Sequence, residues 1–416
     1  MMLKAIRHHR LGSSEIRDLQ DRRLRAMVKH SYVNVPYYHH LFRKAGVKPD
    51  TIRTTEDLVK IPILTKKILK SVALENMCAR NISMSKCTRL NTSGTTGLPL
   101  SVYWTKNALW DGYLRNYRFQ LECGDKITNR QVDISAGWVP HNILFQRFGI
   151  FETLQIPAYA NIRLIIERIR EFGAATLITL PSFVMLLCKE IKETGSKDLH
   201  LPLIFAGGEM ILDFTRKISW DVLGAELFGG FGTNELGFVA GECIEHFGYH
   251  VEGDSCIVEI TKNGERVSPD EEGDVTVTNL TNRATPLLRY NLEDVGMLAG
   301  EKCSCGSCFP VMKITKGRKS DFFKTPNGRI IPATTISVCL APIEGIKQFQ
   351  VIQEKIDHFV VRITKAKTFR KEMTEAIATK LKEVVGKAHV DVSIDNEIPR
   401  GKSRKFTPLV TKIPVG

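Results

Sequence analysis

Residues 92–99 of this 416-residue chain have the sequence Thr-Ser-Gly-Thr-Thr-Gly-Leu-Pro. Its two glycines allow positive φ angles and close approach of the backbone to a ligand, and its four hydroxyl groups can donate hydrogen bonds to phosphate oxygens. The spacing and the lysine of a Walker A loop are absent. The stretch predicts a loop that wraps a polyphosphate with N–H and O–H groups. The alternative is a polar turn between two strands.

Helical and strand-like patterns alternate in the middle of the chain. Apolar residues at helical spacing over 162–172 are followed by the apolar run 175–180, a second helical pattern over 184–191 and a strand-like run over 201–206 that ends in glycines. This alternation with short connections is typical of an α/β sheet. Between Tyr249 and Leu298 the pattern becomes β-rich, with Asn-Gly and Glu-Gly turns.

A break near Gly317 separates the last part of the chain. Strand-like runs over 348–354, 358–364 and 389–395 and a helical pattern over 369–384 follow it. We therefore expect an α/β protein with a large N-terminal domain of several subdomains at residues 1–316, helical at its start. A small, mobile α+β domain should follow at residues 317–416.

The charge balance of the chain is basic. Lys and Arg number 59 against 45 Asp and Glu, which gives a net charge of +14. Nucleic acid, an anionic membrane surface and a polyphosphate-bearing small molecule all fit this charge. The basic residues are spread along the chain and form no basic arm, as on an ordinary enzyme surface. No apolar run reaches the ~18 residues of a membrane span, and residues 1–20 lack a signal-peptide core. We expect a cytoplasmic protein.

The loop at 92–99 resembles the phosphate-binding signature of the adenylate-forming superfamily, which includes acyl- and aryl-CoA ligases. Four further stretches resemble motifs of that family in the same order. They are Phe231–Glu235 (FGTNE), Arg289–Asp294 (RYNLED), Gly317-Arg318 with Asp321, and Pro399–Lys402 (PRGK). Residues 34–46 (NVPYYHHLFRKAG), residues 56–66 and the CSCG at 303–306 are similar to the phenylacetate-CoA ligase-like and CapK-like branch.

The resemblance implies ATP-dependent activation of a carboxylic acid through an acyl-adenylate, followed by transfer to a thiol, usually that of coenzyme A. It implies that Lys402 bridges the acid and the α-phosphate, that Glu235 holds Mg²⁺, that Asp294 binds the ribose hydroxyls with Arg318 beside it, and that Phe231 stacks on adenine. The full set of expected nucleotide-binding residues is Thr92, Ser93, Gly94, Thr95, Thr96, Gly97, Gly208, Glu209, Phe231, Gly232, Thr233, Asn234, Asp294 and Arg318.

Several positions depart from the family pattern. Leu98 or Leu100 stands where many relatives have a lysine, Asn234 replaces Thr or Ser, and Glu293 replaces the glycine before Asp294. We expect the amide of Asn234 to bond phosphate and Glu293 to change the local turn. Residues 133–141, with Trp138, are expected to line the acid pocket.

Three thiols, Cys303, Cys305 and Cys308, lie within six residues. Branch members carry a Cys…Tyr-His segment upstream, similar here to the stretch from Cys243 to His250. The resemblance implies a closed Cys₃His zinc site made of Cys243, His250, Cys303 and Cys305, with His246 and Cys308 as spare ligands. Such a site would be structural, and the alternative is a reduced cysteine-rich loop without metal.

The sequence is also compatible with other acyl acceptors and with another class of function. An adenylating enzyme could pass the acyl group to a carrier protein, an amine or a cofactor instead of CoA. A zinc-containing nucleic-acid-binding protein would also explain the charge and the cysteines, but the chain has no aromatic/basic RNA motif and no paired CxxC ribbon. We therefore expect small-molecule partners, namely an acid that the sequence does not identify, ATP and CoA, with no nucleic acid. A homodimer is compatible with the sequence.

Overall fold

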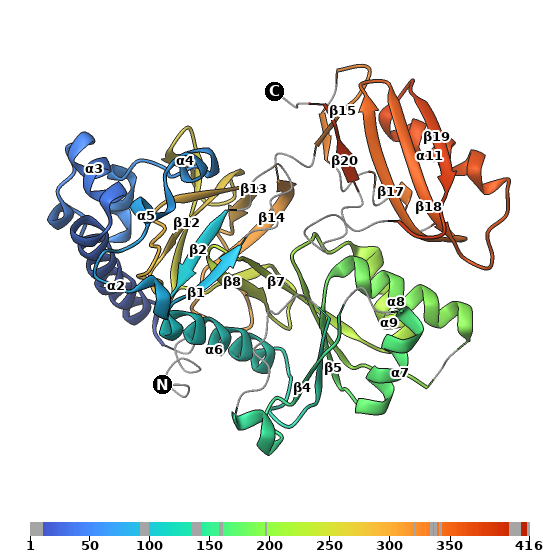
Figure 1. The fold of residues 1–416 in the computed structure, drawn as a ribbon, viewed down its shortest axis with the longest axis horizontal. Helices are drawn as coiled ribbons and strands as arrows, with labels where there is room; N and C mark the ends of the chain where they lie inside the picture. The colour runs from blue at the N-terminus through green and yellow to red at the C-terminus, as the bar shows by residue number, and fades with distance from the viewer. Residues whose placement is uncertain are drawn as a thin grey trace. The chain divides into compact units, whose positions relative to one another are not determined.

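The computed structural model describes residues 11–91, 100–134, 144–157, 161–195, 198–318, 322–328, 330–332, 336, 339–340, 343–398 and 409–413 (Figure 1). The chain forms two compact units. The first comprises Met1–Lys126 with Phe228–Thr315, and the second Ile127–Leu227 with Lys316–Gly416. The phosphate loop at 92–99, Trp138 and Lys402 lie outside the described residues.

The first unit begins with helices, as predicted. Helix α2 ends where Val35 becomes extended, because Pro36 disfavours a helical residue before it and itself starts α3. Leu24 and Val28 of α2 pack with Tyr38 and Phe42 of α3 in one buried core. The helices are α2 (Ser13–Asn34), α3 (Pro36–Lys44), α4 (Lys66–Ser71), α5 (Leu74–Met77) and α6 (Lys106–Glu122), with 3-10 turns η2 (Pro49–Thr51), η3 (Thr55–Lys60) and η4 (Met84–Lys86).

The remainder of the first unit is largely antiparallel β-structure, which confirms the β-rich prediction for 249–298. Its strands are β7 (Glu226–Thr233), β8 (Gly237–Glu242), β9 (Tyr249–Val251), β10 (Cys256–Lys262), β11 (Glu265–Arg266), β12 (Gly273–Asn279), β13 (Tyr290–Leu298) and β14 (Val311–Arg318), in the order β11-β10-β12-β13-β14-β9-β8-β7. The hairpin of β1 (Thr88–Asn91) and β2 (Ser101–Trp104) pairs Asn91 with Ser101, so residues 92–99 connect two paired strands.

A buried ion cluster lies under α6 in the first unit. Arg118 is fully buried, its Nη1 and Nη2 each lie 3.1 Å from a carboxylate oxygen of Asp254, and Nη2 also contacts Glu252. Its guanidinium carbon lies 5.0 Å from the ring centroid of Phe309. Two buried carboxylates therefore depend on one cation.

The second unit begins with the predicted α/β arrangement. Strands β3 (Gln131–Asp133), β4 (Thr153–Gln155), β5 (Thr176–Thr179) and β6 (Leu203–Gly207) are parallel in the order β6-β5-β3-β4. Ile165 and Ile169 of α7 and Val184 and Leu187 of α8 are buried in the same core as these strands. The helices are α7 (Ile162–Phe172), α8 (Pro181–Thr194) and α9 (Asp213–Leu223), with η5 at Leu144–Phe148.

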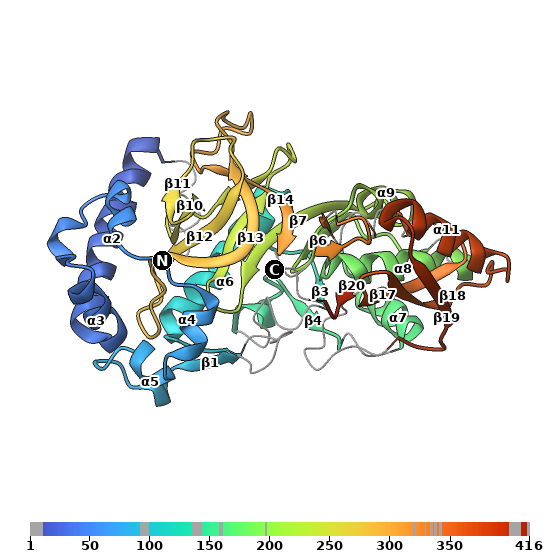
Figure 2. The same cartoon turned by 90° about the horizontal axis from the view of Figure 1, so that it is seen from above.

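The C-terminal part of the second unit is the predicted small α+β structure. Helix α11 (Met373–Val385) covers a four-stranded sheet of order β19-β18-β17-β20 through Ile377, Leu381 and Val385 (Figures 1 and 2). The sheet strands are β17 (Ile346–Lys355), β18 (His358–Lys365), β19 (His389–Ile394) and β20 (Leu409–Thr411), and β15 (Phe322–Lys324) pairs with β16 (Ile330–Pro332). Lys347 of β17 contacts the buried Glu190 of α8. The domain boundary at 316/317 stays a prediction. Of the described helices, none combines the length and apolar character that crossing a bilayer requires.

Replacing Arg118 by Met should strongly destabilise the first unit. The substitution leaves Glu252 and Asp254 buried without their cation, which costs about 3–5 kcal/mol of unfolding free energy. Urea denaturation followed by circular dichroism measures this loss. The control is Lys217→Met, which breaks an exposed 3.0 Å pair with Asp221 and should change the unfolding free energy by less than about 1 kcal/mol. Equal effects of both substitutions would contradict the prediction.

Candidate active site and cysteine cluster

The β7–β8 hairpin of the first unit carries the predicted motif at Phe231–Glu235 across its turn. A Cβ atom at Gly232 would lie 2.5 Å from the carbonyl oxygen of Gly237, so glycine alone fits there. Gly237 itself has a φ of +73°, and the pairing shifts register between Phe231 and Gly232. This close approach fixes the backbone that presents Thr233, Asn234 and Glu235.

Asn234 connects this turn to the strand that precedes the phosphate loop. Its Nδ2 donates to the carbonyl oxygen of Asn91 at 2.9 Å, and its own carbonyl oxygen accepts from Nε1 of Trp104 at 3.2 Å. Asn91 is the residue immediately before 92–99. The amide that we expected to bond phosphate thus bonds the residue immediately before the loop through its Nδ2. Sequence reasoning missed Asn91 and Trp104, although both flank the loop in the printed sequence.

Glu235 lies on the turn with its side chain nearly buried, at 8% exposure. The hydroxyl of Tyr290, the first residue of β13, donates to its Oε1 at 3.5 Å. This contact brings the second and third family motifs together in the first unit. The described geometry suits a carboxylate that is oriented before it meets a cation.

The other predicted nucleotide-binding residues fall on both units. Phe231 packs at 62° against Tyr249, with 6.4 Å between ring centroids, and Asp294 of β13 is 8% exposed. In the second unit, the Glu209 carboxylate accepts from the backbone N and Oγ of Ser182 at 2.9 and 3.0 Å and so caps the start of α8, a role that was not predicted. Gly208 beside it has a φ of +78°. Arg318 is the last residue of β14.

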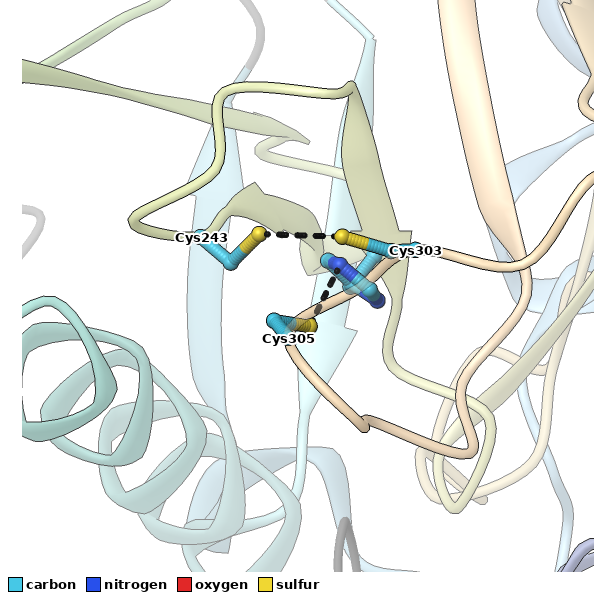
Figure 3. A group of neighbouring side chains, drawn as sticks. Cys243, Cys303 and Cys305 are labelled. Carbon is cyan, nitrogen blue, oxygen red and sulfur yellow. Dashed lines mark hydrogen bonds between the residues drawn. The ribbon is translucent and has the colours of Figure 1, made fainter.

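The cysteine cluster assembles as predicted, also within the first unit (Figure 3). The sulfur atoms of Cys243 and Cys303 lie 3.5 Å apart, Sγ of Cys305 lies 3.4 Å from Nε2 of His250, and the four ligand atoms lie within 4.8 Å of one another. Tetrahedral zinc with bonds of about 2.0–2.3 Å needs ligand atoms roughly 3.5–3.8 Å apart. The donor set and its spacing therefore fit zinc.

The surroundings of the cluster support the same assignment. Nδ1 of His250 lies 3.3 Å from the carbonyl oxygen of Phe309 and must donate to it, which leaves the Nε2 lone pair toward the thiols. Burial raises the pKa of Cys243 to about 12 and lowers the pKa of His250. Of the two spare ligands, His246 instead stacks on Phe228 and contacts Glu242, and neither His246 nor Cys308 belongs to the four-ligand group.

Comparisons with known proteins agree with this geometry. The CapK C-terminal domain matches residues 323–412. The chain is 27% identical to a phenylacetate-coenzyme A ligase of Thermus thermophilus, over 88% of this chain and 85% of the relative, and 29% identical to one of Pseudomonas putida, over 76% and 74%. The chain is thus a homologue of phenylacetate-CoA ligases, and its C-terminal part matches the CapK C-terminal domain.

Solved structures share the fold of this chain. A 2-hydroxyisobutyryl-CoA ligase in the postadenylation state, in complex with R3-HIB-AMP, aligns with a TM-score of 0.80 at 16% identity, over 98% of this chain and 91% of that one. O-succinylbenzoate coenzyme A synthetase from Bacillus subtilis, in complex with ATP and magnesium, aligns with a TM-score of 0.52 at 16% identity, over 77% and 68%.

The first residue of the Arg289–Asp294 motif has a structural role. The buried guanidinium of Arg289 donates to Oε2 of Glu259 at 3.1 Å and to the carbonyl oxygens of Ile61 and Gly264 at 2.8 and 2.9 Å. Arg289 therefore ties β13 to the N-terminal segment. It contacts protein through each of its three guanidinium nitrogens.

Glu293 has a left-handed backbone conformation, which glycine adopts more readily than other residues. Its φ is +67°, and its N–H donates to Oδ1 of Asn291 at 2.7 Å. Between two neighbouring β12–β13 pairs, β12 has one residue and β13 has the three residues 292–294, so Glu293 lies in a β-bulge. The bulge thus gives the glutamate a left-handed conformation, and the expectation that Glu293 changes the local turn stays a prediction.

Replacing Glu293 by Gly should stabilise the protein. A left-handed residue other than glycine costs about 1–2 kcal/mol, and the extra chain entropy of glycine offsets about 0.5–1 kcal/mol of that gain. We expect a net increase of about 0.5–1 kcal/mol in the unfolding free energy, measured by urea denaturation. The control Glu271→Gly, at an exposed position without positive φ, should lower it by a similar amount. Destabilisation by both would show that the bulge is unstrained.

Proposed function

We propose that this protein is an AMP-forming carboxylic acid–CoA ligase. It activates an acid with ATP to form an acyl-adenylate and pyrophosphate, and then transfers the acyl group to the thiol of CoA. The observation that carries this proposal is the meeting of three motifs in the first unit. Asn234 bonds the residue before the phosphate loop, and Tyr290 bonds Glu235. The relatives named phenylacetate-coenzyme A ligases and the structures that hold an acyl-AMP support the same chemistry.

The first half-reaction brings two anions together, so positioned cations and donors should dominate catalysis. We assign Glu235 as the Mg²⁺ ligand, because a hard cation prefers carboxylate oxygens and this carboxylate is already oriented by Tyr290. Bound magnesium would neutralise charge on the phosphates. Asp294 can accept from both ribose hydroxyls through one carboxylate, and Phe231 supplies an aromatic face for adenine.

The remaining assignments rest on the family motifs. Thr92–Gly97 would hold the phosphates with N–H and O–H donors, and Arg318 would approach the ribose. Lys402 would bridge the substrate carboxylate and the α-phosphate, because a compact ammonium offers three donors. Gly208 and Glu209 would lie beside adenine, with Glu209 acting through the backbone that its bond to Ser182 fixes.

A second candidate concerns the acceptor. The match to the CapK C-terminal domain over residues 323–412 associates this chain with proteins other than phenylacetate-CoA ligases. An adenylating enzyme that passes the acyl group to a carrier protein, an amine or a cofactor would use the same first half-reaction. Only the products distinguish it from a CoA ligase.

We also propose that Cys243, His250, Cys303 and Cys305 hold one structural zinc ion. Four protein ligands close a tetrahedron and leave no position for substrate. Cys243 directly follows β8, His250 lies within β9, and Cys303 and Cys305 lie in the loop 299–310 before β14, so the ion would brace three parts of the β-rich first unit. A closed site of this kind stabilises the fold rather than contributing to the reaction.

Lys402→Ala and Glu235→Gln should each reduce acid-dependent ATP–pyrophosphate exchange on the order of 10²-fold or more, because each removes charge stabilisation of the transition state. The rate at which radiolabelled pyrophosphate is incorporated into ATP measures this reduction. Phenylacetate is the first acid to be tested in a panel of carboxylic acids. Lys412→Ala is the matched control, because Lys412 pairs with Glu354 at the surface, 2.6 Å away. It should leave exchange unchanged.

Two outcomes would change the assignment. If no acid in a broad panel supports exchange by the parent protein, the ligase proposal fails. If exchange occurs but no acyl-CoA appears by mass spectrometry when CoA is added, the non-CoA acceptor becomes the better proposal. AMP should accumulate with acyl-CoA in equal amounts if CoA is the acceptor.

Purified protein should contain about one equivalent of zinc by elemental analysis, and Cys303→Ser should contain much less. Loss of the ion should also lower the thermal midpoint of unfolding, because binding to the folded state alone stabilises it. Cys87→Ser is the control, since Cys87 lies outside the cluster with its sulfur 3.6 Å from the carbonyl oxygen of Ser83. Absence of metal from both the parent and the control would contradict the zinc proposal.

A further inference from the structure

Two histidines and an aspartate meet at one edge of the C-terminal sheet. His358 begins β18 and His389 begins β19, and these parallel strands pair His358 with His389 and Val360 with Asp391. Side chains two residues apart on a strand share a face, as do directly paired ones. The register therefore places His358, His389 and Asp391 on the same face of the sheet.

The three side chains converge on one another. Nε2 of His358 lies 2.8 Å from Oδ2 of Asp391, and Nε2 of His389 lies 3.0 Å from Oδ1 of the same carboxylate. The two imidazole rings have centroids 5.1 Å apart. One ligand atom from each residue lies within 4.8 Å of the other two.

We propose that His358, His389 and Asp391 form a second metal site, which binds a divalent first-row transition metal. Two imidazole nitrogens and one carboxylate oxygen suit Zn²⁺, Co²⁺, Ni²⁺ or Cu²⁺, whereas Mg²⁺ and Ca²⁺ prefer oxygen ligands throughout. The side chains are 29%, 71% and 54% exposed, so water can fill the remaining coordination positions. The site thus differs in donors and in exposure from the buried cysteine cluster.

Metal binding here would have a structural consequence for the sheet. β19 is an edge strand in the order β19-β18-β17-β20. An edge strand presents unpaired backbone groups and is held by one neighbour only. A cation shared by His358 of β18 and by His389 and Asp391 of β19 would crosslink β19 to β18. The bonds that the two histidines now make to the Asp391 carboxylate would be replaced by bonds from all three side chains to the metal.

Cobalt provides a test that separates the two sites within the full-length protein. Co²⁺ bound by thiolates gives an intense sulfur-to-metal charge-transfer band, whereas Co²⁺ bound by imidazole, carboxylate and water gives only weak d–d bands. The experiment titrates Co²⁺ into Cys303→Ser protein that has been freed of metal, and follows binding by absorbance and by calorimetry. We expect about one equivalent to bind without a charge-transfer band.

Variants identify the ligands. In the Cys303→Ser background, His358→Asn and His389→Asn should each weaken Co²⁺ binding by at least about tenfold. Each should also abolish the rise that Co²⁺ produces in the thermal midpoint of unfolding of the C-terminal part. The control is His40→Asn, which changes an exposed histidine of α3 in the first unit. Circular dichroism without metal should be the same for the three histidine variants and their Cys303→Ser parent, because the three substituted histidines are at least partly exposed.

The proposal is overturned if Cys303→Ser protein binds no Co²⁺, or if His358→Asn and His389→Asn bind it as tightly as the control. Neither result bears on the ligase activity, since pyrophosphate exchange is measured separately. Conversely, failure of exchange with every acid leaves this metal site unaffected.

Discussion

The contact between Gly232 and the carbonyl oxygen of Gly237 is the constraint on which the candidate site depends. Any side chain at position 232 would enter the space of that oxygen, only 2.5 Å from its Cβ. The narrow hairpin that results turns its tip toward β1 and β13, where Asn234 and Glu235 find their partners. Backbone packing, rather than the polar contacts themselves, thus determines where the polar groups lie.

Some motif residues hold the backbone of the site in place, and others carry the groups that we assign to binding and catalysis. Arg289 and Asn234 donate hydrogen bonds to protein carbonyl groups. Glu209 accepts a hydrogen bond from the backbone N–H of Ser182 at the start of α8. Glu235 has the hydroxyl of Tyr290 as a neighbour and is nearly buried, as is Asp294. A nearly buried carboxylate that a hydroxyl group orients, as at Glu235, is suited to gain a cation, whereas a guanidinium whose three nitrogens all contact protein is not. The same motif can therefore combine both kinds of residue.

The fold class and the cysteine cluster could be predicted from the sequence because their signals are local or chemically specific. Helical spacing identified α7 and α8, alternation identified β10 and β12, and thiols with an imidazole are a distinctive ligand set. The structural roles of Arg289 and Glu209 could not be predicted. Their hydrogen-bond partners Ile61 and Ser182 are distant in the sequence, and nothing in the sequence marks them as partners. The His358–His389 pair likewise depends on strand register, which no single segment of sequence reveals.

Departures from a family pattern must therefore be judged by the backbone that surrounds them. At Glu293 the side chain differs from glycine, and the bulge between β12 and β13 holds this residue in a left-handed conformation just before Asp294. At Asn234 the side chain differs from Thr or Ser, and the longer amide gains a bond to Asn91 that a hydroxyl on a shorter side chain would not make in the same way. The first change costs conformational energy in the backbone, whereas the second adds a hydrogen bond to the residue that precedes the phosphate loop. Of the two, the change at Asn234 should have the greater effect on how this protein binds a nucleotide.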